Sequence, residues 1–455
     1  MGVSKYMRGT TMMLRLSSVF AIACAAVFMC SEADAAGFYL QEQSTSNQGA
    51  AFAGAAANPQ DASTLFYNPA GITSLGDSSV SADVSVIAPT LHFKNTGSTA
   101  VSAGGPPAAV YAGNNGGNPF KPTPVPSFYG VHPIEGGKYW LGLSVTSPFG
   151  LDNDYNSGWF GRYDSTESSL KTVNVSPVFA MKLGDRFSVG GGPNFQYVDA
   201  RLDNALPCPS TICGPGAFTT ATDGKSRLEG DAWTVGYNLG ALYKVTDKTQ
   251  VGASYRSAMT QHINDGVVTV SGLLGPLAAG NGTQHATADL SLPDTFSLGV
   301  QHQATDQLSL LASYNWFGWN NFNAIRVNFT GPQPTSVTPE NYDNSYSVAL
   351  GAQWKQNDNW TFRGGLQYDQ TPTTLPDRST RTPDSDRYWL SAGATYLLGN
   401  NMLVDFAASH LFMKDGQVGL TKNFYTGTGA DTTVNVTGKT TSHVDILSFQ
   451  ATWKF

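Results

Sequence analysis

The residues best suited to chemistry in this sequence are a pair of cysteines and one cluster of charged side chains. Cys208 and Cys213 lie in a segment rich in proline and glycine, PCPSTICGPG. In an exported protein, two cysteines at this spacing are expected to form a local disulfide. A metal site would need further ligands, and no histidine lies nearby. We therefore predict a disulfide and no metal site.

The charged cluster lies between Tyr368 and Trp389, in a chain that otherwise carries few charges. Its members are Asp369, Arg378, Arg381, Asp384, Asp386 and Arg387. One interpretation is a solvated loop with surface ion pairs, which contribute little to stability. The other is a polar ring at the mouth of a pocket, where an arginine pairs with a ligand carboxylate.

Motifs for catalysis or cofactor binding are absent from the sequence. The 7 histidines are scattered, and neither HExxH, GxSxG nor a phosphate-cradling glycine loop is present. Gly190-Gly191-Gly192 falls within an expected strand, where it indicates a bend or room for a segment packed against the strand. We predict no catalytic residue, no cofactor and no enzymatic activity.

The amino-acid composition indicates the class of fold that carries these residues. Charged residues make up 13% of the chain, about half the average of soluble proteins. The mean hydropathy is -0.19, and no apolar run of the length of a membrane helix follows residue 36, which argues against a helical membrane bundle. The low charged fraction and the slightly negative mean hydropathy fit a transmembrane β-barrel, which exposes only every second side chain to lipid. A net charge of -7 without a basic patch argues against nucleic acid as a partner.

Residues 1–35 have the features of a secretory signal peptide. Positive residues precede the apolar region VFAIACAAVFM, and Ala33-Asp34-Ala35 is a small-x-small cleavage site. A membrane anchor would need a longer apolar region, and a lipoprotein signal at Cys30 would need a smaller residue than Met29 before it. We expect the mature chain to begin at Ala36.

The segment from Ala36 to Ile72 differs from everything that follows it. It is rich in small residues, carries only Glu42 and Asp61 as charges, and lacks a sustained period of two. A compact segment before a long run of strands predicts a plug, or hatch, inside a barrel; the alternative is a flexible leader. We assign residues 36–77 to a hatch and residues 78–455 to the barrel.

From Ser78 onward, strands of about ten residues alternate with connections. Trp233–Val245 shows the strand period most clearly, with apolar and aromatic residues at every second position. Short turns alternate with long loops, among them 203–230 and 414–441, and we count about fourteen strands. Outer-membrane barrels have short periplasmic turns, long external loops and an even number of antiparallel strands. A soluble sandwich or propeller, the alternative, does not segregate its connections so strictly. The last strand, Asp445–Phe455, alternates as well and ends in the phenylalanine typical of outer-membrane assembly signals.

Several short motifs connect these patterns to a family. They are AGFYL at Ala36, Asn68-Pro69-Ala70, SVTSPFGL at Ser144, Tyr255-Arg256-Ser257, and YDxxP…R…PDxDRxWLSAG from Tyr368 to Gly393. In this order, over the whole mature chain, they resemble the FadL-type long-chain fatty acid transporters. The resemblance implies a fourteen-stranded barrel with an N-terminal hatch. It also implies spontaneous uptake of hydrophobic molecules, with a lateral opening at a kinked third strand.

The resemblance assigns residues to the hatch. Gly37 and Phe38 match the N-terminal plug residues, and Asn68, Pro69 and Ala70 match the hatch motif.

It also assigns residues to the opening and to the pocket. Ser147 and Gly150 match the kink, whereas Pro148 and Phe149 depart from the best-known member, which puts the size of the opening in doubt. Pro148 lacks a ladder donor and should break strand pairing, although it could also simply begin an external loop. Asp369 matches an acidic residue near the pocket, and Arg201 is our candidate partner for a ligand carboxylate.

We therefore expect an outer-membrane β-barrel that takes up long-chain fatty acids or similar hydrophobic molecules without an energy source. An importer of aromatic hydrocarbons is the alternative within the family. A general porin would predict charged walls and no plug, and a barrel enzyme would predict a Ser/His or paired-acid site. The expected partners are the hydrophobic ligand, outer-membrane lipids with lipopolysaccharide, and the barrel assembly machinery, with the chain itself a monomer.

Overall fold

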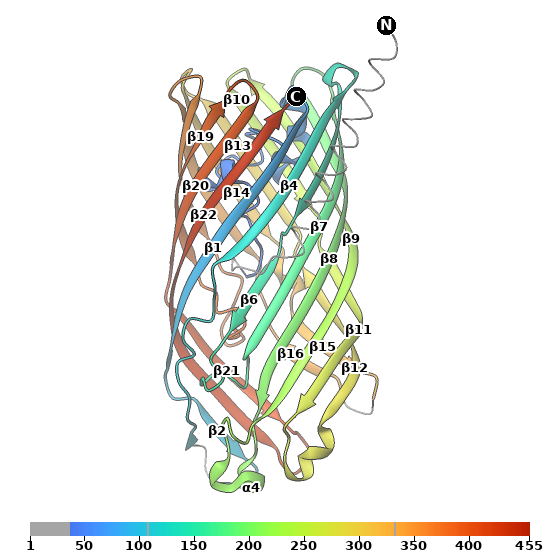
Figure 1. Cartoon of the computed structure of the whole chain (residues 1–455), viewed down its shortest axis with the longest axis vertical. Coiled ribbons are helices and arrows are strands. Elements are labelled where there is room, and N and C mark those ends of the chain that lie inside the picture. The colour runs from blue at the N-terminus through green and yellow to red at the C-terminus, as the bar shows by residue number, and fades with distance from the viewer. Residues whose placement is uncertain (1–36, 107–108, 332–333) are drawn as a thin grey trace.

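The computed structural model describes residues 37–106, 109–331 and 334–455. The predicted signal peptide at residues 1–35 lies outside them. The described chain forms a closed barrel of 14 antiparallel strands (Figure 1). The first strand, β1 (Ser79–Asn95), closes the ring by pairing along its whole length with the last, β22 (Thr432–Lys454). The predicted all-β barrel and its strand number are confirmed.

Several barrel strands are interrupted once, and both parts then carry their own label. In chain order the strands are β1, β4 (Thr123–Ile134), β5 with β6 (Tyr139–Thr146, Gly150–Asp154), β7 (Glu167–Lys182), β8 (Phe187–Leu206), β9 (Gly224–Thr246), β10 with β11 (Thr249–Arg256, Met259–Ser271), β12 with β13 (Gly282–Leu292, Thr295–Gln303), β14 with β15 (Leu308–Phe317, Ala324–Phe329), β16 with β17 (Ser336–Pro339, Ser345–Lys355), β18 (Trp360–Asp369), β19 (Arg387–Leu398), β20 with β21 (Met402–Met413, Gly416–Phe424) and β22. The short strands β2 (Thr99–Ser102) and β3 (Ala109–Val110) lie in the first long connection.

Alternation along each strand separates the two faces of the wall. In β22, Leu447 and Phe449 are exposed on the outside, whereas Ser448 and Gln450 are buried in the lumen. Successive side chains of a strand point to opposite faces, so one strand supplies both an apolar outer surface and a polar inner one. No helix within the described ranges has both the length and the apolar character needed to cross a bilayer.

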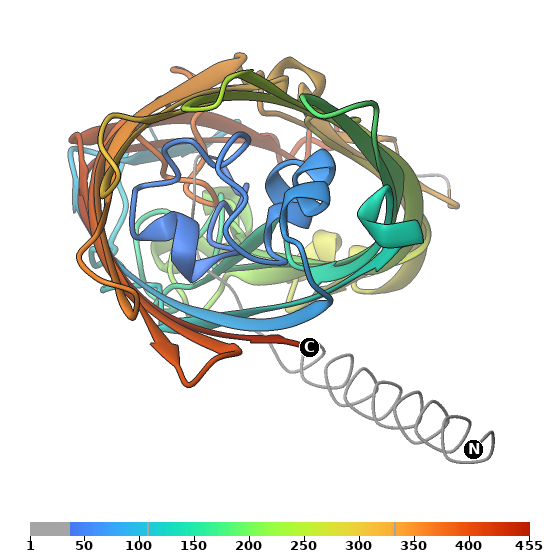
Figure 2. The ribbon, with the colours of Figure 1, turned by 90° about the horizontal axis from the view of Figure 1, so that it is seen from above.

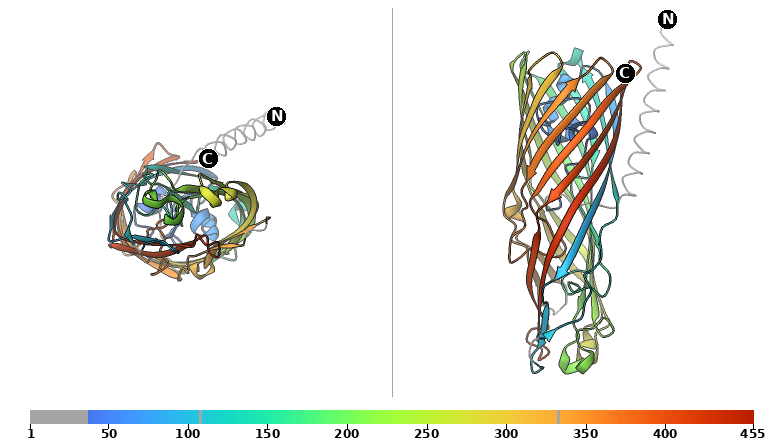
Figure 3. Two further views of the ribbon diagram at one scale, coloured as in Figure 1. Left: turned by 90° about the horizontal axis from the view of Figure 1, so that it is seen from below. Right: turned by 90° about the vertical axis from the view of Figure 1, so that its left-hand side faces the viewer.

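Short turns and long connections lie at opposite ends of the barrel (Figures 1 and 3). The short turns connect β4 to β5, β7 to β8, β9 to β10, β13 to β14, β17 to β18 and β19 to β20. Figure 3 shows, in a second side view, the tilted strands and the segment with α4 (Ser210–Cys213) at the far end.

Two predicted long loops are wrong, because strands continue into them. The segment 203–230 contains the ends of β8 and β9, and the segment 414–441 contains β21 and the start of β22. Charged cross-strand pairs support the ladder there: Arg227 binds the Asp203 carboxylate at 3.1 Å. In these strand parts the outward-facing side chains are polar, as with Arg227 and Thr421, whereas apolar residues such as Val418 and Val436 face inward. The sequence therefore lacks the apolar outer face of a strand in lipid and is typical of a loop.

The hatch, residues 37–77, lies inside the ring of strands (Figure 2). It contains the short helices α2 (Thr45–Gln48), α3 (Thr64–Tyr67) and η1 (Pro69–Ser74). Its first helix, α2, is fixed to the β1–β22 seam. The Thr45 N–H and hydroxyl donate to Asp83 Oδ2 at 2.7 and 2.5 Å, and Ser448 Oγ donates to Gln48 Oε1 at 2.5 Å.

Glycines in the wall let the hatch backbone approach closely. A Cβ on Gly190 would lie 2.9 Å from the Ala70 nitrogen, and one on Gly240 would lie 2.1 Å from Asn68 Oδ1. Of the two roles considered for Gly190-Gly191-Gly192, a bend or room for a packed segment, the contact of Gly190 with Ala70 supports the second: the glycine leaves room for the hatch.

Further short helices lie at connections or strand interruptions. They are η2 (Glu135–Gly137), α4, η3 (Gly214–Gly216), η4 (Gly275–Gly280) and η5 (Trp319–Asn321).

Candidate functional site

A cavity of about 740 Å³ lies in the lumen beside the N-terminal end of the hatch. Leu170, Leu202 and Leu228 line it from three adjacent strands, β7, β8 and β9. The other apolar lining residues include Phe38, Leu151, Ala200, Ile263, Ala288, Leu290, Phe322 and Ile325. The predominantly apolar lining suits a hydrocarbon chain.

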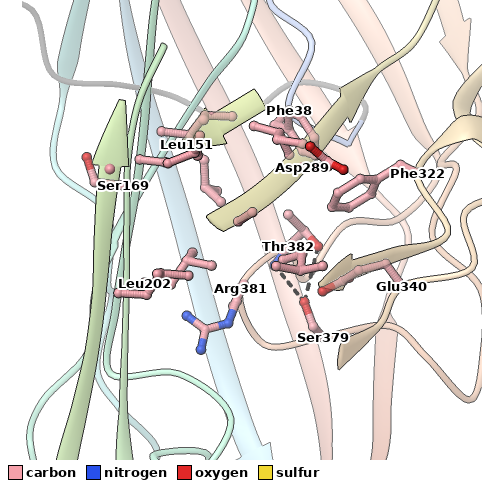
Figure 4. A pocket seen from close by; sticks show the side chains of 18 of the residues that line it. Phe38, Leu151, Ser169, Leu202, Asp289, Phe322, Glu340, Ser379, Arg381 and Thr382 are labelled. Carbon is pink, nitrogen blue, oxygen red and sulfur yellow. Dashed lines mark hydrogen bonds between the residues drawn. The ribbon is translucent and has the colours of Figure 1, made fainter. Parts of the chain in front are cut away.

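One end of the cavity is polar and comes from external connections. Figure 4 shows Arg381, Ser379 and Glu340 gathered below Phe38 and Phe322. Arg381 donates through Nη1 to Ser168 Oγ at 2.9 Å and through Nη2 to the Asp164 carbonyl oxygen at 2.6 Å. Within the described residues its guanidinium forms no ion pair with a carboxylate. The cavity thus combines apolar walls with a cation at one end.

Two acids behind this polar end hold opposite protonation states. Burial, and secondly the charge of Asp164, raises the pKa of the Glu340 carboxyl to about 8. Burial alone would raise the pKa of Asp164 as well, but the charges of Lys422 and Arg381 outweigh it and lower the pKa to about 2. Lys422 Nζ lies 2.7 Å from Asp164 Oδ1. At neutral pH the polar end therefore has a neutral Glu340 and keeps its positive charge on Arg381.

Arg201, the predicted partner of a ligand carboxylate, does not line this cavity. Ala200 and Leu202 do, and Arg201 between them projects to the opposite face of β8. There its Nη2 pairs with Glu167 at 2.7 Å and with Asp203 at 2.9 Å. The arginine that lines the cavity is Arg381, which the sequence placed in the charged cluster without distinguishing it from its neighbours.

Asp369 is fully buried at the end of β18 and is also outside the cavity lining. Its Oδ2 lies 3.1 Å from Arg387 Nε, and Arg387 Nη2 lies 3.4 Å from Asp384. Asp384 in turn accepts the Gly37 N–H at 3.0 Å. Asp369 therefore belongs to an ionic network that anchors the start of the hatch.

Phe38 is the hatch residue that reaches the cavity. Its ring packs at centroid distances of 4.7 Å from Trp319, 5.4 Å from Phe322 and 6.5 Å from Tyr342. Gly37 has a φ of 66°, and a Cβ there would lie 2.8 Å from Trp319. Movement of this end of the hatch would change the shape of the cavity directly.

The wall is interrupted next to Phe38. β5 ends at Thr146 and its continuation β6 begins at Gly150, with Pro148 between them. Pairing with β4 ends at the level of Val145, whereas β6 keeps its ladder with β7. Pro148 therefore does not simply begin an external loop.

The hatch supplies the hydrogen bonds that the interrupted ladder lacks. Leu40 N–H donates to the Pro148 carbonyl at 2.8 Å, and Gly150 N–H donates to the Phe38 carbonyl at 2.9 Å. The Gln43 side chain sits between the separated edges: its Oε1 accepts from Ser147 N–H at 3.1 Å and from Ser127 Oγ at 2.7 Å. Gln43 was not identified from sequence, where it is one of two glutamines in LQEQ.

The predicted hatch motif holds the hatch against the wall farther from the cavity. Asn68 Nδ2 donates to the carbonyls of Ala56 at 2.6 Å and Ala241 at 2.9 Å, and Asn68 Oδ1 accepts the Ala70 N–H at 3.0 Å. Pro69 occupies the first position of η1, where its missing N–H costs nothing. The motif therefore connects two segments of the hatch to each other and the hatch to strand β9 of the wall.

Cys208 and Cys213 are joined by a disulfide across α4, with Cα atoms 6.1 Å apart. The pair lies in the connection between β8 and β9 and is not part of the cavity lining.

Comparison with known proteins identifies the family. A model described as "Outer membrane protein transport protein (OMPP1/FadL/TodX)" matches residues 26–455. The long-chain fatty acid transport protein of Escherichia coli (strain K12) is 29% identical, over 86% of this chain and 91% of that protein. Outer membrane protein P1 of Haemophilus influenzae is 26% identical, over 95% and 98% of the two chains.

Solved structures share the fold. That of a Pseudomonas aeruginosa FadL homologue superimposes with a TM-score of 0.81 at 26% identity, over 92% of this chain and all of that one. The Ralstonia pickettii toluene transporter TbuX gives a TM-score of 0.62 at 22% identity, over 90% and 97% of the two chains. The family consists of transport proteins, which agrees with the expectation that the chain is not an enzyme. With a matching family model over almost its full length, the chain belongs to the outer membrane protein transport family (OMPP1/FadL/TodX) and is an outer-membrane β-barrel.

Proposed function

We propose that this protein imports long-chain fatty acids, or hydrophobic molecules with a similar carboxylate head, by passive diffusion gated by the hatch. The observation that carries the proposal is the cavity itself, which joins an apolar lining to a cation without a carboxylate partner among the described residues, Arg381. The relatives named as long-chain fatty acid transport proteins support the same ligand class.

The free energy of burial would drive capture. Each methylene group that leaves water for the apolar walls contributes about 0.8 kcal/mol, so a long chain needs no energy source to enter. The carboxylate head would accept hydrogen bonds from Arg381, and the neutral Glu340 would add no repulsion.

Exit would follow the break in the wall. Phe38 lines the cavity and its carbonyl bonds Gly150 across the break, so one displacement of the hatch end would open both. A hydrophobic molecule leaving sideways would stay out of water. Because lipid cannot satisfy open strand edges, a break at membrane depth needs protein or a cavity behind it, and here the hatch fills that place.

An importer of aromatic hydrocarbons is the second candidate. The rings of Phe38, Phe322 and Tyr342 at the cavity favour an aromatic ligand, and the toluene transporters share the fold. A hydrocarbon, however, gives the half-buried guanidinium of Arg381 no counter-charge, which favours the carboxylate. Lipopolysaccharide and the barrel assembly machinery stay predicted partners.

Equilibrium binding of labelled oleate and of toluene to the purified full chain tests the proposal. Arg381→Gln should weaken oleate binding by about 10- to 100-fold, the loss expected for a charged hydrogen bond. Toluene binding should not change. Arg201→Gln is the matched control, because it removes an arginine from the outer face of β8. Equal oleate affinity in both variants, or tight binding of toluene alone, would contradict the proposal.

A further inference from the structure

A second cavity, of about 520 Å³, lies on the other side of the first hatch residues. Phe38 lines the first cavity, and its neighbour Tyr39 lines the second. The wall of the second cavity comes from β9, β10, β13 and β14, and its other side is the hatch. It differs from the first in carrying several amides and hydroxyls, from Gln41, Asn238, Ser254, Thr295 and Asn315.

Among the residues that the structure describes, Arg256 is the only cationic side chain that lines this second cavity. It is the last residue of β10, points into the lumen and is only 5% exposed. Its Nη2 donates to the Phe66 carbonyl at 3.3 Å, and its guanidinium lies 4.9 Å from the centre of the Phe66 ring. Its Nη1 is buried without a hydrogen-bond partner. Within the described residues Arg256 has no ion pair.

A second donor in the same cavity also lacks a partner. Gln41 is 4% exposed, and its Nε2 is buried without a hydrogen bond. Its backbone carbonyl accepts from Tyr67 Oη at 2.7 Å, which holds the residue in the hatch. Arg256 belongs to the wall and Gln41 to the hatch, so the two residues with an unpartnered donor line the cavity from its two sides.

An unpaired guanidinium at this depth is costly. A charge removed from water without a counter-charge is strongly destabilising, and buried ionisable groups inside membrane proteins mark sites of function. A carboxylate carries one negative charge and several lone pairs. It can therefore accept hydrogen bonds from both donors and neutralise the guanidinium at the same time. The rings of Phe52, Phe66 and Phe317 line the same cavity and suit a hydrocarbon chain beside the head.

We propose that the second cavity is a further carboxylate-binding subsite, in which Arg256 Nη1 and Gln41 Nε2 hold the head of the transported amphiphile. The inference rests on the proposed function for its ligand. A carboxylate bound there joins the hatch to the wall, so occupancy of the subsite stabilises one position of the hatch.

Photolabelling at the level of single peptides tests the subsite. The probe is laurate with a diazirine near its carboxylate, and the neutral control is lauryl alcohol with the same group. In the purified full chain, laurate should label residues 39–67 and 254–256 as well as the peptide that contains Arg381. The alcohol should label the first set at least tenfold less.

Variants separate a ligand site from a structural role. Arg256→Gln should remove laurate labelling of residues 39–67 while labelling near Arg381 persists, and Arg256→Lys should retain part of it. Arg381→Gln should give the opposite loss. Heat-modifiable electrophoretic mobility verifies folding of each variant, and Gln41→Leu gives a second test that leaves the Phe66 contact intact.

The outcomes distinguish the two proposals. Labelling near Arg381 alone, equal in wild type and Arg256→Gln, means that the second cavity holds only water, and this overturns the subsite. Equal labelling of residues 39–67 by acid and alcohol overturns it as well. If laurate labels neither cavity, the proposed function fails together with the subsite.

Discussion

Gln43 and Ser147 exchange two hydrogen bonds across the break in the barrel wall. Gln43 Nε2 donates to the Ser147 carbonyl at 2.8 Å, and the Ser147 N–H donates to Gln43 Oε1 at 3.1 Å. A side-chain amide thereby imitates the backbone of a neighbouring strand. The groups it satisfies are those that a strand edge would otherwise leave open at membrane depth.

Gln43→Ala should therefore loosen the break. The variant leaves buried backbone groups of Ser147 unpaired, at a cost of about 1–3 kcal/mol. We expect faster hydrogen exchange at the Ser147 amide and larger ion conductance in planar bilayers. Gln48→Ala is the matched control, because it removes a bond from the hatch to Ser448 away from the break. Wild-type exchange and conductance in Gln43→Ala would show that the amide is not what closes the wall.

Arginine placed at the break should separate binding from passage. Ser147→Arg and Gly150→Arg fill the proposed lateral exit with a long charged side chain, whereas the cavity lining is unchanged. We expect uptake of labelled oleate by cells to fall severalfold at matched surface levels, with binding to the purified barrel retained. Unchanged uptake in both variants would place the path along the barrel axis.

Ionisation of Glu340 should make carboxylate binding depend on pH. Its folded-state pKa is raised from 4.5 to about 8, so the carboxyl stays neutral between these values and becomes charged above them. A charged Glu340 repels a ligand carboxylate in the same cavity. The affinity for laurate should thus fall as the pH rises through about 8. Titrations about one pH unit below and above that value, in wild type and Glu340→Gln, measure the effect, and a fall of equal size in Glu340→Gln would assign it to another group.

Gly240→Ala should disturb the packing of the Asn68-Pro69-Ala70 motif against the barrel wall. The added methyl group would meet Asn68 Oδ1 at 2.1 Å and Pro69 Cδ at 2.8 Å, and such overpacking costs about 1–3 kcal/mol. We expect faster proteolysis within residues 58–77 and a lower temperature of heat modification. Gly419→Ala is the control, because its Cβ would have no atom within 4 Å. Similar proteolysis of the two variants would mean that the motif tolerates displacement.

The alternation of apolar and polar residues made the barrel strands predictable. Where this alternation is missing, strand residues were assigned to loops. Trp233–Val245 alternates apolar and polar residues, and its strand was found. The part of β9 that precedes it alternates charge, as with Arg227 and Glu229, and was assigned to a loop. A strand part outside lipid has a polar outer face, so it lacks the apolar outer positions that identify a membrane-spanning strand.

Site residues were predictable only as a group. A shift of one position moves a side chain to the other face of a strand, which is why Arg201 was chosen although its neighbours line the cavity. Arg381 lies in a connection that folds into the lumen, where no periodicity gives its direction. Gln43 and Arg256 depend on contacts between hatch and wall residues that are distant in sequence.

The position of the hatch at the seam sets an order for assembly. Asp83 on β1 and Ser448 on β22 meet their partners Thr45 and Gln48 on the hatch side of the ladder that joins the two chain ends of the barrel. A sheet that closed over an empty interior would bury these polar groups without partners. Because residues 37–77 directly precede β1, they are present before the last strand arrives. We therefore expect docking of the hatch and closure of the final ladder to occur in one cooperative step of biogenesis.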